Sequence, residues 1–429
     1  MNVETLSRLQ FAFTIGFHYI YPPLSIGLGV MLVLMEGMYL KTGNKLYELM
    51  TRFWIKIFAL IFGIGVATGI IMEFEFGTNW AVYSKYVGDV FGSALASEGL
   101  FAFALESGFL GVLLFGWNKV NPKVHFFSTI MVAFGSIFSA VWIVVANSWQ
   151  QTPAGFHIVG EGMKARAEIT DFWAMVFNPS SMDRLTHVLI AAFLSGAFLV
   201  LSVHAFYILK NRFADFAKAG FKIALVFATI SSLVQLYSGD RSAHTVAIYQ
   251  PAKLASFEGH YDSLAKADLF LFGLTHPNEQ STSGIKIPGG LSFLLHEDFN
   301  APVKGINAFS KDSRPGPNEI QFVFQTYHIM VFLGLFMIGL TLLACFLWWR
   351  GTLFQHKWLM VLFTFSVVLP QIANQVGWYS AEVGRQPWVV YGLLRTSEGL
   401  TRSLQAGQVL FSLILFALVY LMLFLLFLY

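Results

Sequence analysis

Residues 321–349 read QFVFQTYHIMVFLGLFMIGLTLLACFLWW, with no Asp, Glu, Lys or Arg among them. A helix needs about 20 consecutive apolar residues to cross the hydrocarbon core of a bilayer. Eight further stretches meet this requirement, so the sequence predicts an all-α, polytopic membrane bundle of nine transmembrane helices. The nine predicted spans are roughly 10–38, 53–72, 95–116, 126–146, 187–209, 217–237, 321–349, 358–376 and 406–429.

The composition agrees with a membrane protein. Of the 429 residues, 56% are hydrophobic and 45 are Phe, far outside the usage of soluble domains. The single cysteine, Cys345, excludes an intrachain disulfide and a cysteine metal cluster. The N-terminus lacks the pattern of a cleavable signal peptide, so the first apolar segment is expected to remain as a span. A formal charge of +3 gives no indication of nucleic-acid binding.

The basic residues predict the orientation, because cytoplasmic loops carry an excess of Lys and Arg. The loops after the first, third, fifth and seventh spans contain Glu48 and Asp215 as their only acids, against many basic residues. These basic residues are Lys41, Lys45, Arg52, Lys56, Lys119, Lys123, Lys210, Arg212, Lys218, Lys222, Arg350 and Lys357. We therefore expect an outer N-terminus and a cytoplasmic C-terminus.

Residues 238–320 form the longest polar segment, on the outer side between the sixth and seventh spans. Their Pro, Gly, Ser and Asn content predicts a loop with little regular structure, and loops of this length are often functional. The chain is thus expected to comprise helices one to six (1–237), an outer loop domain (238–320) and helices seven to nine (321–429).

Four side chains that can bind iron are predicted at one depth near the outer face: His18, His187, Met330 and Glu382. Taken singly, each has an ordinary explanation, such as a hydrogen-bonded structural His or a gap-filling Met. Together they suggest one layer of sites. A His and a Met from different helices could supply both axial ligands of a low-spin haem, and His18 and Glu382 would then be single ligands.

Two carboxyls, Glu98 and Glu106, fall within the third span, about 12 Å apart along an α-helix and roughly 80° apart around it. Acidic residues inside membranes typically carry protons, so we expect a proton relay; a pair of hydrogen-bonded structural carboxyls is the alternative. Glu73 and Glu75 are expected to be interfacial. His204 is expected to be structural, and the remaining histidines, except His328, are expected to be solvated: His125, His157, His244, His260, His276, His296 and His356.

Six motifs spread over nearly the whole chain resemble subunit I of bacterial cytochrome bd quinol oxidases. They are LSRLQFAFTIGFHYIYPPLSIG (6–27), GVATGIIMEFEFGTNWAVYSKYVGDVFG (65–92), EGLFAFALES (98–107), NPSSMDRLTHV (178–188), YQPAKLASFE (249–258) and GWYSAEVGRQPW (377–388). The resemblance implies a nine-helix haem subunit of a terminal respiratory oxidase. Such a subunit oxidises quinol on the outer side and reduces O2 to water, and it generates a proton gradient by charge separation without pumping.

The resemblance also implies roles for particular residues. His187 and Met330 match the axial ligands of a low-spin haem b, and His18 and Glu382 match the ligands of two high-spin haems. Glu98 and Glu106 match acids linked to proton delivery. In the outer loop, Lys253 and Glu258 match positions implicated in quinol oxidation. Trp378 and Arg385 match residues beside the haems, where Arg385 could pair with propionates.

The implied cofactors are two haem b groups and one haem d, with quinol and O2 as substrates. The implied partners are a bd-type subunit II and a small single-helix subunit, and the implied location is the bacterial inner membrane.

Two features depart from the usual family pattern. His328 stands where an Arg is usual, two residues before Met330, and the outer loop is short. Short-loop relatives include cyanide-insensitive oxidases, some of which use haem b in place of haem d. The resemblance therefore leaves open whether the third haem is of type d or type b. A non-catalytic haem-b membrane anchor and an ion-coupled transporter are the competing interpretations.

Overall fold

A computed structural model of the chain describes residues 2–428. Residue 1 of the predicted segment 1–237 and residue 429 of the predicted segment 321–429 lie outside the described residues. Within this range nine helical segments are long and apolar enough to cross a membrane, as predicted. The first combines α1 (Val3–His18) and α2 (Tyr21–Thr42), and the third combines α5 (Gly88–Ser97), the π-helix η1 (Glu98–Phe103) and α6 (Ala104–Phe115). The others are α3 (Lys45–Thr78), α7 (Pro122–Gln151), α9 (Ser181–Leu209), α10 (Ala214–Tyr249), α13 (Pro317–Trp349), α14 with α15 (Lys357–Phe365, Val368–Val383) and α16 (Ala406–Leu428).

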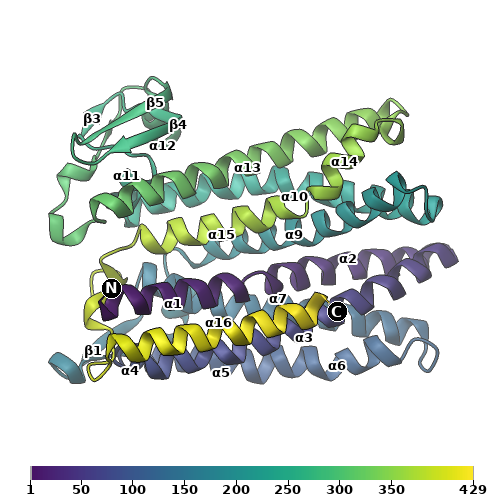
Figure 1. Ribbon diagram of the computed structural model, residues 1–429, viewed down its shortest axis with the longest axis horizontal. Coiled ribbons are helices and arrows are strands. Elements are labelled where there is room, and N and C mark those ends of the chain that lie inside the picture. The colour runs from purple at the N-terminus through teal and green to yellow at the C-terminus, as the bar shows by residue number, and fades with distance from the viewer. Residues whose placement is uncertain (1, 429) are drawn as a thin grey trace.

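The long helices run side by side and alternate in direction (Figure 1). The segment α2 packs against α3, α7 and α9, which places it in the middle of the bundle. Its contact with α9 is backbone to backbone, since a Cβ added at Gly196 would lie 2.2 Å from the carbonyl carbon of Gly27. Two helices can approach so closely only where both carry small residues.

Local signals in the sequence determine where several helices begin. Asn44 accepts a hydrogen bond from the backbone N–H of Leu46 at the start of α3, directly after Gly43 ends α2 in the left-handed conformation. Asn121 caps α7 in the same way, with Pro122 at its first position. Both caps lie on the side expected to be cytoplasmic.

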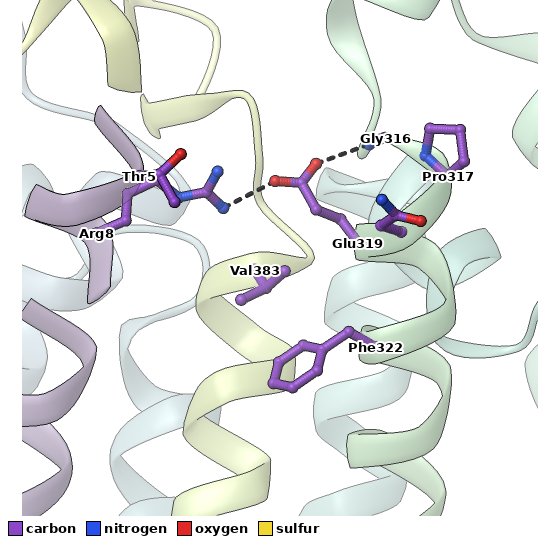
Figure 2. Close-up of a pocket in the computed structure, with 8 residues that line it drawn as sticks. Thr5, Arg8, Gly316, Pro317, Glu319, Phe322 and Val383 are labelled. Atoms are coloured by element: carbon purple, nitrogen blue, oxygen red, sulfur yellow. Dashed lines mark hydrogen bonds and ion pairs between the residues drawn. The ribbon is translucent and has the colours of Figure 1, made fainter. Parts of the chain in front are cut away.

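Glu319 connects two helices at the opposite end of the bundle. Its carboxylate accepts a hydrogen bond from the backbone N–H of Gly316 at the start of α13, 2.8 Å away, and forms an ion pair with Arg8 of α1, also at 2.8 Å. Figure 2 shows both contacts at a surface pocket of about 540 Å³, which Val383 of α15 also lines. None of the predicted site residues lines this pocket.

Segment 238–320 contains more regular structure than expected, so that expectation is wrong. Helix α10 continues to Tyr249 and is followed by α11 (Pro251–Phe257). The remainder forms a small subdomain at the end of the bundle where the N-terminus lies (Figure 1). It contains the β4–β5 hairpin (Leu269–His276, Ser281–Ile287), the β3–β6 pair (Leu264–Ala265, Pro302–Val303), α12 (Gly290–His296), and the short helices η3 (Ile306–Ala308) and η4 (Lys311–Ser313).

The other connecting elements are short. They are α4 (Ala81–Tyr86), α8 (Phe172–Val176), the strand pairs β1–β2 (Phe156–Val159, Arg166–Ile169) and β7–β8 (Trp388–Val390, Leu394–Arg395), and the 3₁₀ turns η2 (Gly162–Lys164), η5 (Leu353–Gln355) and η6 (Thr396–Glu398).

Candidate functional site

Glu382 lies in the last turn of α15, which continues past the predicted end of the eighth span at residue 376. Both of its carboxylate oxygens accept hydrogen bonds. Oε1 accepts from the side-chain amides of Asn147 and Gln151 on α7, each at 3.2 Å, and Oε2 accepts from Arg385. Arg385 is 5% exposed and also donates to Oε1 of Gln150, at 3.0 Å. The end of α7 therefore holds Glu382 and Arg385 together.

The same network reaches two further basic side chains. Arg184 of α9 donates to Oδ1 of Asn147 at 2.5 Å, and Lys253 of α11 donates to Oε1 of Gln151 at 2.9 Å. Lys253 is only 2% exposed. Burial, reinforced by the nearby charges of Arg184 and Arg385, holds the pKa of Lys253 well below its usual range. Three basic side chains thus surround one carboxylate, and a residue of the outer loop is joined to Glu382 through a single amide.

Glu258 follows α11, five residues after Lys253, and is 1% exposed. Neither of its carboxylate oxygens has a hydrogen-bond partner of normal geometry among residues 2–428. Burial raises the pKa of Glu258 to about 7, against a smaller opposing effect of the Tyr327 hydroxyl, which faces it from α13. The ring of Tyr327 stacks on Phe257 at 4.7 Å between centroids, so the loop and α13 enclose this carboxyl.

His18 is the last residue of α1, where the chain breaks before α2. Its Nδ1 lies 2.9 Å from the Thr68 hydroxyl of α3. That hydroxyl donates its own proton to the carbonyl oxygen of Ile64 or Gly65, so it accepts from Nδ1–H and leaves Nε2 with a free lone pair.

His187 lies in the second turn of α9, and a similar contact fixes its ring. Its Nδ1 lies 3.1 Å from the Ser238 hydroxyl of α10, which donates to the carbonyl oxygen of Gln235. The amide nitrogen of Gln235 lies 3.1 Å from Nε2, while its amide oxygen is buried without a partner in the described chain. The sulfur of Met330 lies against Gly377 of α15, where an added Cβ would come within 2.6 Å of it.

Trp378, the residue after Gly377, packs on Phe11 of α1 with 6.0 Å between ring centroids. It therefore lies between α15 and α1.

Glu98 and Glu106 both face α7. Glu98 accepts a hydrogen bond from Ser139 at 2.5 Å, and Glu106 accepts one from Ser136. The offset of about 80° expected for a regular α-helix is wrong, because η1 forms a π-turn between the two residues. A π-turn contains more residues per turn than an α-turn, so it rotates Glu98 toward the face that carries Glu106.

The whole chain was compared with known proteins. Residues 6–429 match the family model described as cytochrome bd terminal oxidase subunit I. The chain belongs to this family. It is 38% identical to cytochrome bd ubiquinol oxidase subunit 1 of Bacillus subtilis (strain 168), over 99% of this chain and 91% of that one. It is 35% identical to cytochrome bd-II ubiquinol oxidase subunit 1 of Escherichia coli (strain K12), over 96% and 92%.

The fold has a close relative among solved structures. The bd oxidase from Geobacillus thermodenitrificans superposes with a TM-score of 0.91, at 29% identity, over 99% of this chain and 96% of that chain. The chain is therefore a multi-pass membrane subunit of a bacterial cytochrome bd oxidase, a multisubunit terminal respiratory oxidase that uses haem.

The side chains of this bd oxidase subunit fit haem in two respects. His18 presents Nε2 as a free acceptor, while His187 has its Nδ1 proton fixed by a serine; both arrangements are usual for a ligating His. Beside Glu382, the Nε atoms of Arg184 and Arg385 are buried without a partner among residues 2–428, and a propionate carboxylate would satisfy such donors. Among the described residues, no three His, Cys, Asp or Glu side chains lie close enough together to hold a metal ion. A haem iron requires only one or two protein ligands.

Several site residues were not predicted from the sequence. Asn147, Gln151 and Arg184 are ordinary polar residues near span ends, and only their shared contacts with Glu382 mark them. Glu75, expected at the interface, is instead fully buried and accepts a hydrogen bond from Thr14 at 2.7 Å. His125 and His260, expected to be solvated, are 2% and 8% exposed.

His328 lies between two backbone carbonyl oxygens, 2.8 Å from that of Phe324 and 2.9 Å from that of Phe270 in β4. It therefore ties the outer subdomain to α13, two residues before Met330.

Proposed function

We propose that this chain is the catalytic subunit of a quinol oxidase that oxidises quinol at its outer loop and reduces O2 to water. The supporting observation is the buried network from Lys253 through Gln151 to Glu382 and Arg385. It connects the loop proposed to bind quinol directly with a proposed haem ligand. A non-catalytic haem-b anchor would have no use for the carboxyls Glu98 and Glu106 held along α7.

The proposed ligands divide into three sites. His187 and Met330 hold a low-spin haem b, and His18 and Glu382 each hold a high-spin haem, one of type b and the other of type d or b. Bound haem supplies the one-electron transfers and the binding of oxygen, which no amino-acid side chain can perform. Arg385 and Arg184 offset propionate charge, and Trp378 packs beside the haems.

The outer loop supplies the quinol site. A quinol that loses electrons must also lose its hydroxyl protons, and a base with a pKa near the working pH accepts them best. Glu258, with its pKa raised to about 7, has this property, and we assign it the proton acceptor role. Lys253 orients the quinol oxygen and stabilises the negative charge that develops there. Residues 238–320 are thus the quinol-binding domain, flanked by the ligand-bearing segments 1–237 and 321–429.

Glu98 and Glu106 hold and pass protons taken from the cytoplasm. Quinol protons leave on the outer side and the protons for water enter from the inner side, so charge is separated across the membrane without a pump. A subunit II and a small single-helix subunit are the proposed partners in the membrane.

The assembled enzyme, purified with its partner subunits, tests this function. With a short-chain quinol it should consume O2, and its reduced-minus-oxidised spectrum should show low-spin and high-spin haem. A haem spectrum without quinol-driven oxygen uptake would favour the membrane anchor instead. Absence of any haem would favour the transporter.

A further inference from the structure

A buried acid–base pair lies at the inner end of the bundle, outside every site described above. Glu36 of α2 and His125 of α7 are each 2% exposed, and Oε1 of Glu36 lies 2.6 Å from Nδ1 of His125. The other carboxylate oxygen of Glu36 accepts from the Thr129 hydroxyl at 2.5 Å. All the polar atoms of this pair are therefore engaged within the protein.

The contacts define how many protons the pair carries. The second ring nitrogen of His125, Nε2, lies 3.1 Å from the carbonyl oxygen of Leu113. A carbonyl oxygen can only accept, so Nε2 carries a proton. The short contact between Nδ1 and Glu36 then holds one more proton, either on the ring opposite a carboxylate or on the carboxyl opposite a neutral ring. A pair that accommodates its proton on either member is suited to receive one and pass it on.

The pair is connected to the inner surface. Trp117 packs edge-on against His125, with 4.2 Å between ring centroids, and donates its indole N–H to Glu48 at 3.0 Å. Glu48 also pairs with Arg52 and with the exposed Lys45. Glu48, Arg52 and Lys45 lie in the loop region expected to face the cytoplasm.

The pair is also aligned with the two carboxyls of the third span. Helix α7 provides one hydroxyl to each of three acids in turn: Thr129 to Glu36, Ser136 to Glu106 and Ser139 to Glu98. The steps along α7 are about 10 Å and about 5 Å. On the partner helix α6, Leu113 lies two turns from Glu106 and so on the same face. All three acids therefore lie along one seam, ordered from the inner surface outward.

We propose that Glu36 and His125 form the inner proton-loading site, which takes a proton from the cytoplasm and delivers it to Glu106. In each cycle the shared proton leaves toward the Glu106 carboxylate, and a cytoplasmic proton replaces it on His125. Between Thr129 and Ser136, α7 carries the apolar residues Val132 and Ala133. Because neither side chain can carry a proton, water between the helices must carry it across that step. This proposal rests on the proton uptake assigned above to Glu98 and Glu106.

The test uses the complete enzyme reconstituted in vesicles. A pH indicator is placed on the side of the membrane that carries the basic loops, which is expected to be cytoplasmic. Glu36→Gln keeps the size of the side chain but cannot hold the proton. It should slow proton uptake and oxygen consumption about tenfold or more, with haem content and haem reduction by quinol in the absence of O2 unchanged. Glu36→Asp should restore part of the rate. Ser128→Ala is the matched control, because Ser128 is equally buried on the same turn of α7 but donates only to the backbone of Val124.

Normal proton uptake in Glu36→Gln, alongside loss of uptake in Glu106→Gln, would overturn the proposal while leaving the proposed function intact. If Glu36→Gln fails to assemble, Thr129→Val replaces it, since this change removes only the hydroxyl at the carboxyl; full uptake in that variant would equally reject the proposal. An inactive wild-type enzyme would instead refute the proposed function.

Discussion

Single residues carry the chemistry of this chain, and their neighbours decide what each can do. Glu382 was singled out by its sequence, an acid at the end of an apolar stretch, but its setting among Arg184, Lys253 and Arg385 was not. Arg385 is only three residues from Glu382, but Arg184 and Lys253 come from other segments, so only folding brings them to this carboxylate. Depth along predicted spans could indicate His18, His187 and Met330, whereas the serine and threonine that orient the histidines carry no signal in sequence.

Replacing Met330 by Leu should remove the low-spin haem signal from the reduced-minus-oxidised spectrum, because Leu has no sulfur to bind iron. Met337→Leu is the control: it lies two turns along α13 and is 2% exposed, so that variant should keep the spectrum. A low-spin signal that persists in Met330→Leu would show that another side chain is the ligand.

Quinol oxidation should depend on the ionisation of Glu258. Because its pKa is raised to about 7, the carboxylate form that accepts a proton increases as pH rises from 6 to 8, and the rate of quinol-driven haem reduction should rise with it. Glu258→Gln should lower this rate by roughly 10²-fold or more, the usual contribution of a general base, and abolish its rise with pH. A variant that retained the same pH profile would exclude this role.

At the scale of elements, helix periodicity predicted the spans but not their irregularities. The π-turn η1 leaves no mark in an apolar sequence, yet it places Glu98 on the face of Glu106. Helix α10 extends to Tyr249 although its last turns are polar, because they pack beneath the outer subdomain through Val246 and Ala247. Composition alone assigned that stretch to a loop.

The close contact of α2 with α9 should be sensitive to any added volume. Gly196→Ala would place a Cβ 2.2 Å from backbone atoms of Gly27, and such overpacking usually costs about 1–3 kcal/mol, occasionally more. The thermal midpoint of the purified enzyme should therefore fall. Gly63→Ala, where an added Cβ meets nothing within 4 Å, should leave it unchanged; equal behaviour of the two variants would show that the helices are not this close.

For the whole molecule, nine spans and the distribution of basic residues predict that the N-terminus lies outside and the C-terminus in the cytoplasm. The loop-and-hairpin subdomain lies at the end where the N-terminus lies (Figure 1), which agrees with an outer quinol site if the basic loops are cytoplasmic. The exposed apolar side chains along the outer surfaces of α3, η1, α10 and α16 suit lipid or partner subunits.

This orientation predicts the labelling of introduced cysteines in intact cells. A membrane-impermeant thiol reagent should react with Glu279→Cys in the outer hairpin and not with Thr42→Cys at the end of α2. Because Cys345 is the chain's only native cysteine, Cys345→Ser provides the background for both variants. The reverse pattern would invert the topology and place the quinol site on the cytoplasmic side.

Measuring proton release and proton uptake together shows whether quinol oxidation and O2 reduction exchange protons with opposite sides of the membrane. With the complete enzyme in sealed vesicles and a quinol as donor, we expect about one proton per electron to appear on the side of the outer loop, since a quinol releases two protons with two electrons. About one proton per electron should disappear from the other side, since the reduction of O2 to two water molecules consumes four electrons and four protons. Both proton changes on one side of the membrane, or release well above one per electron, would contradict it.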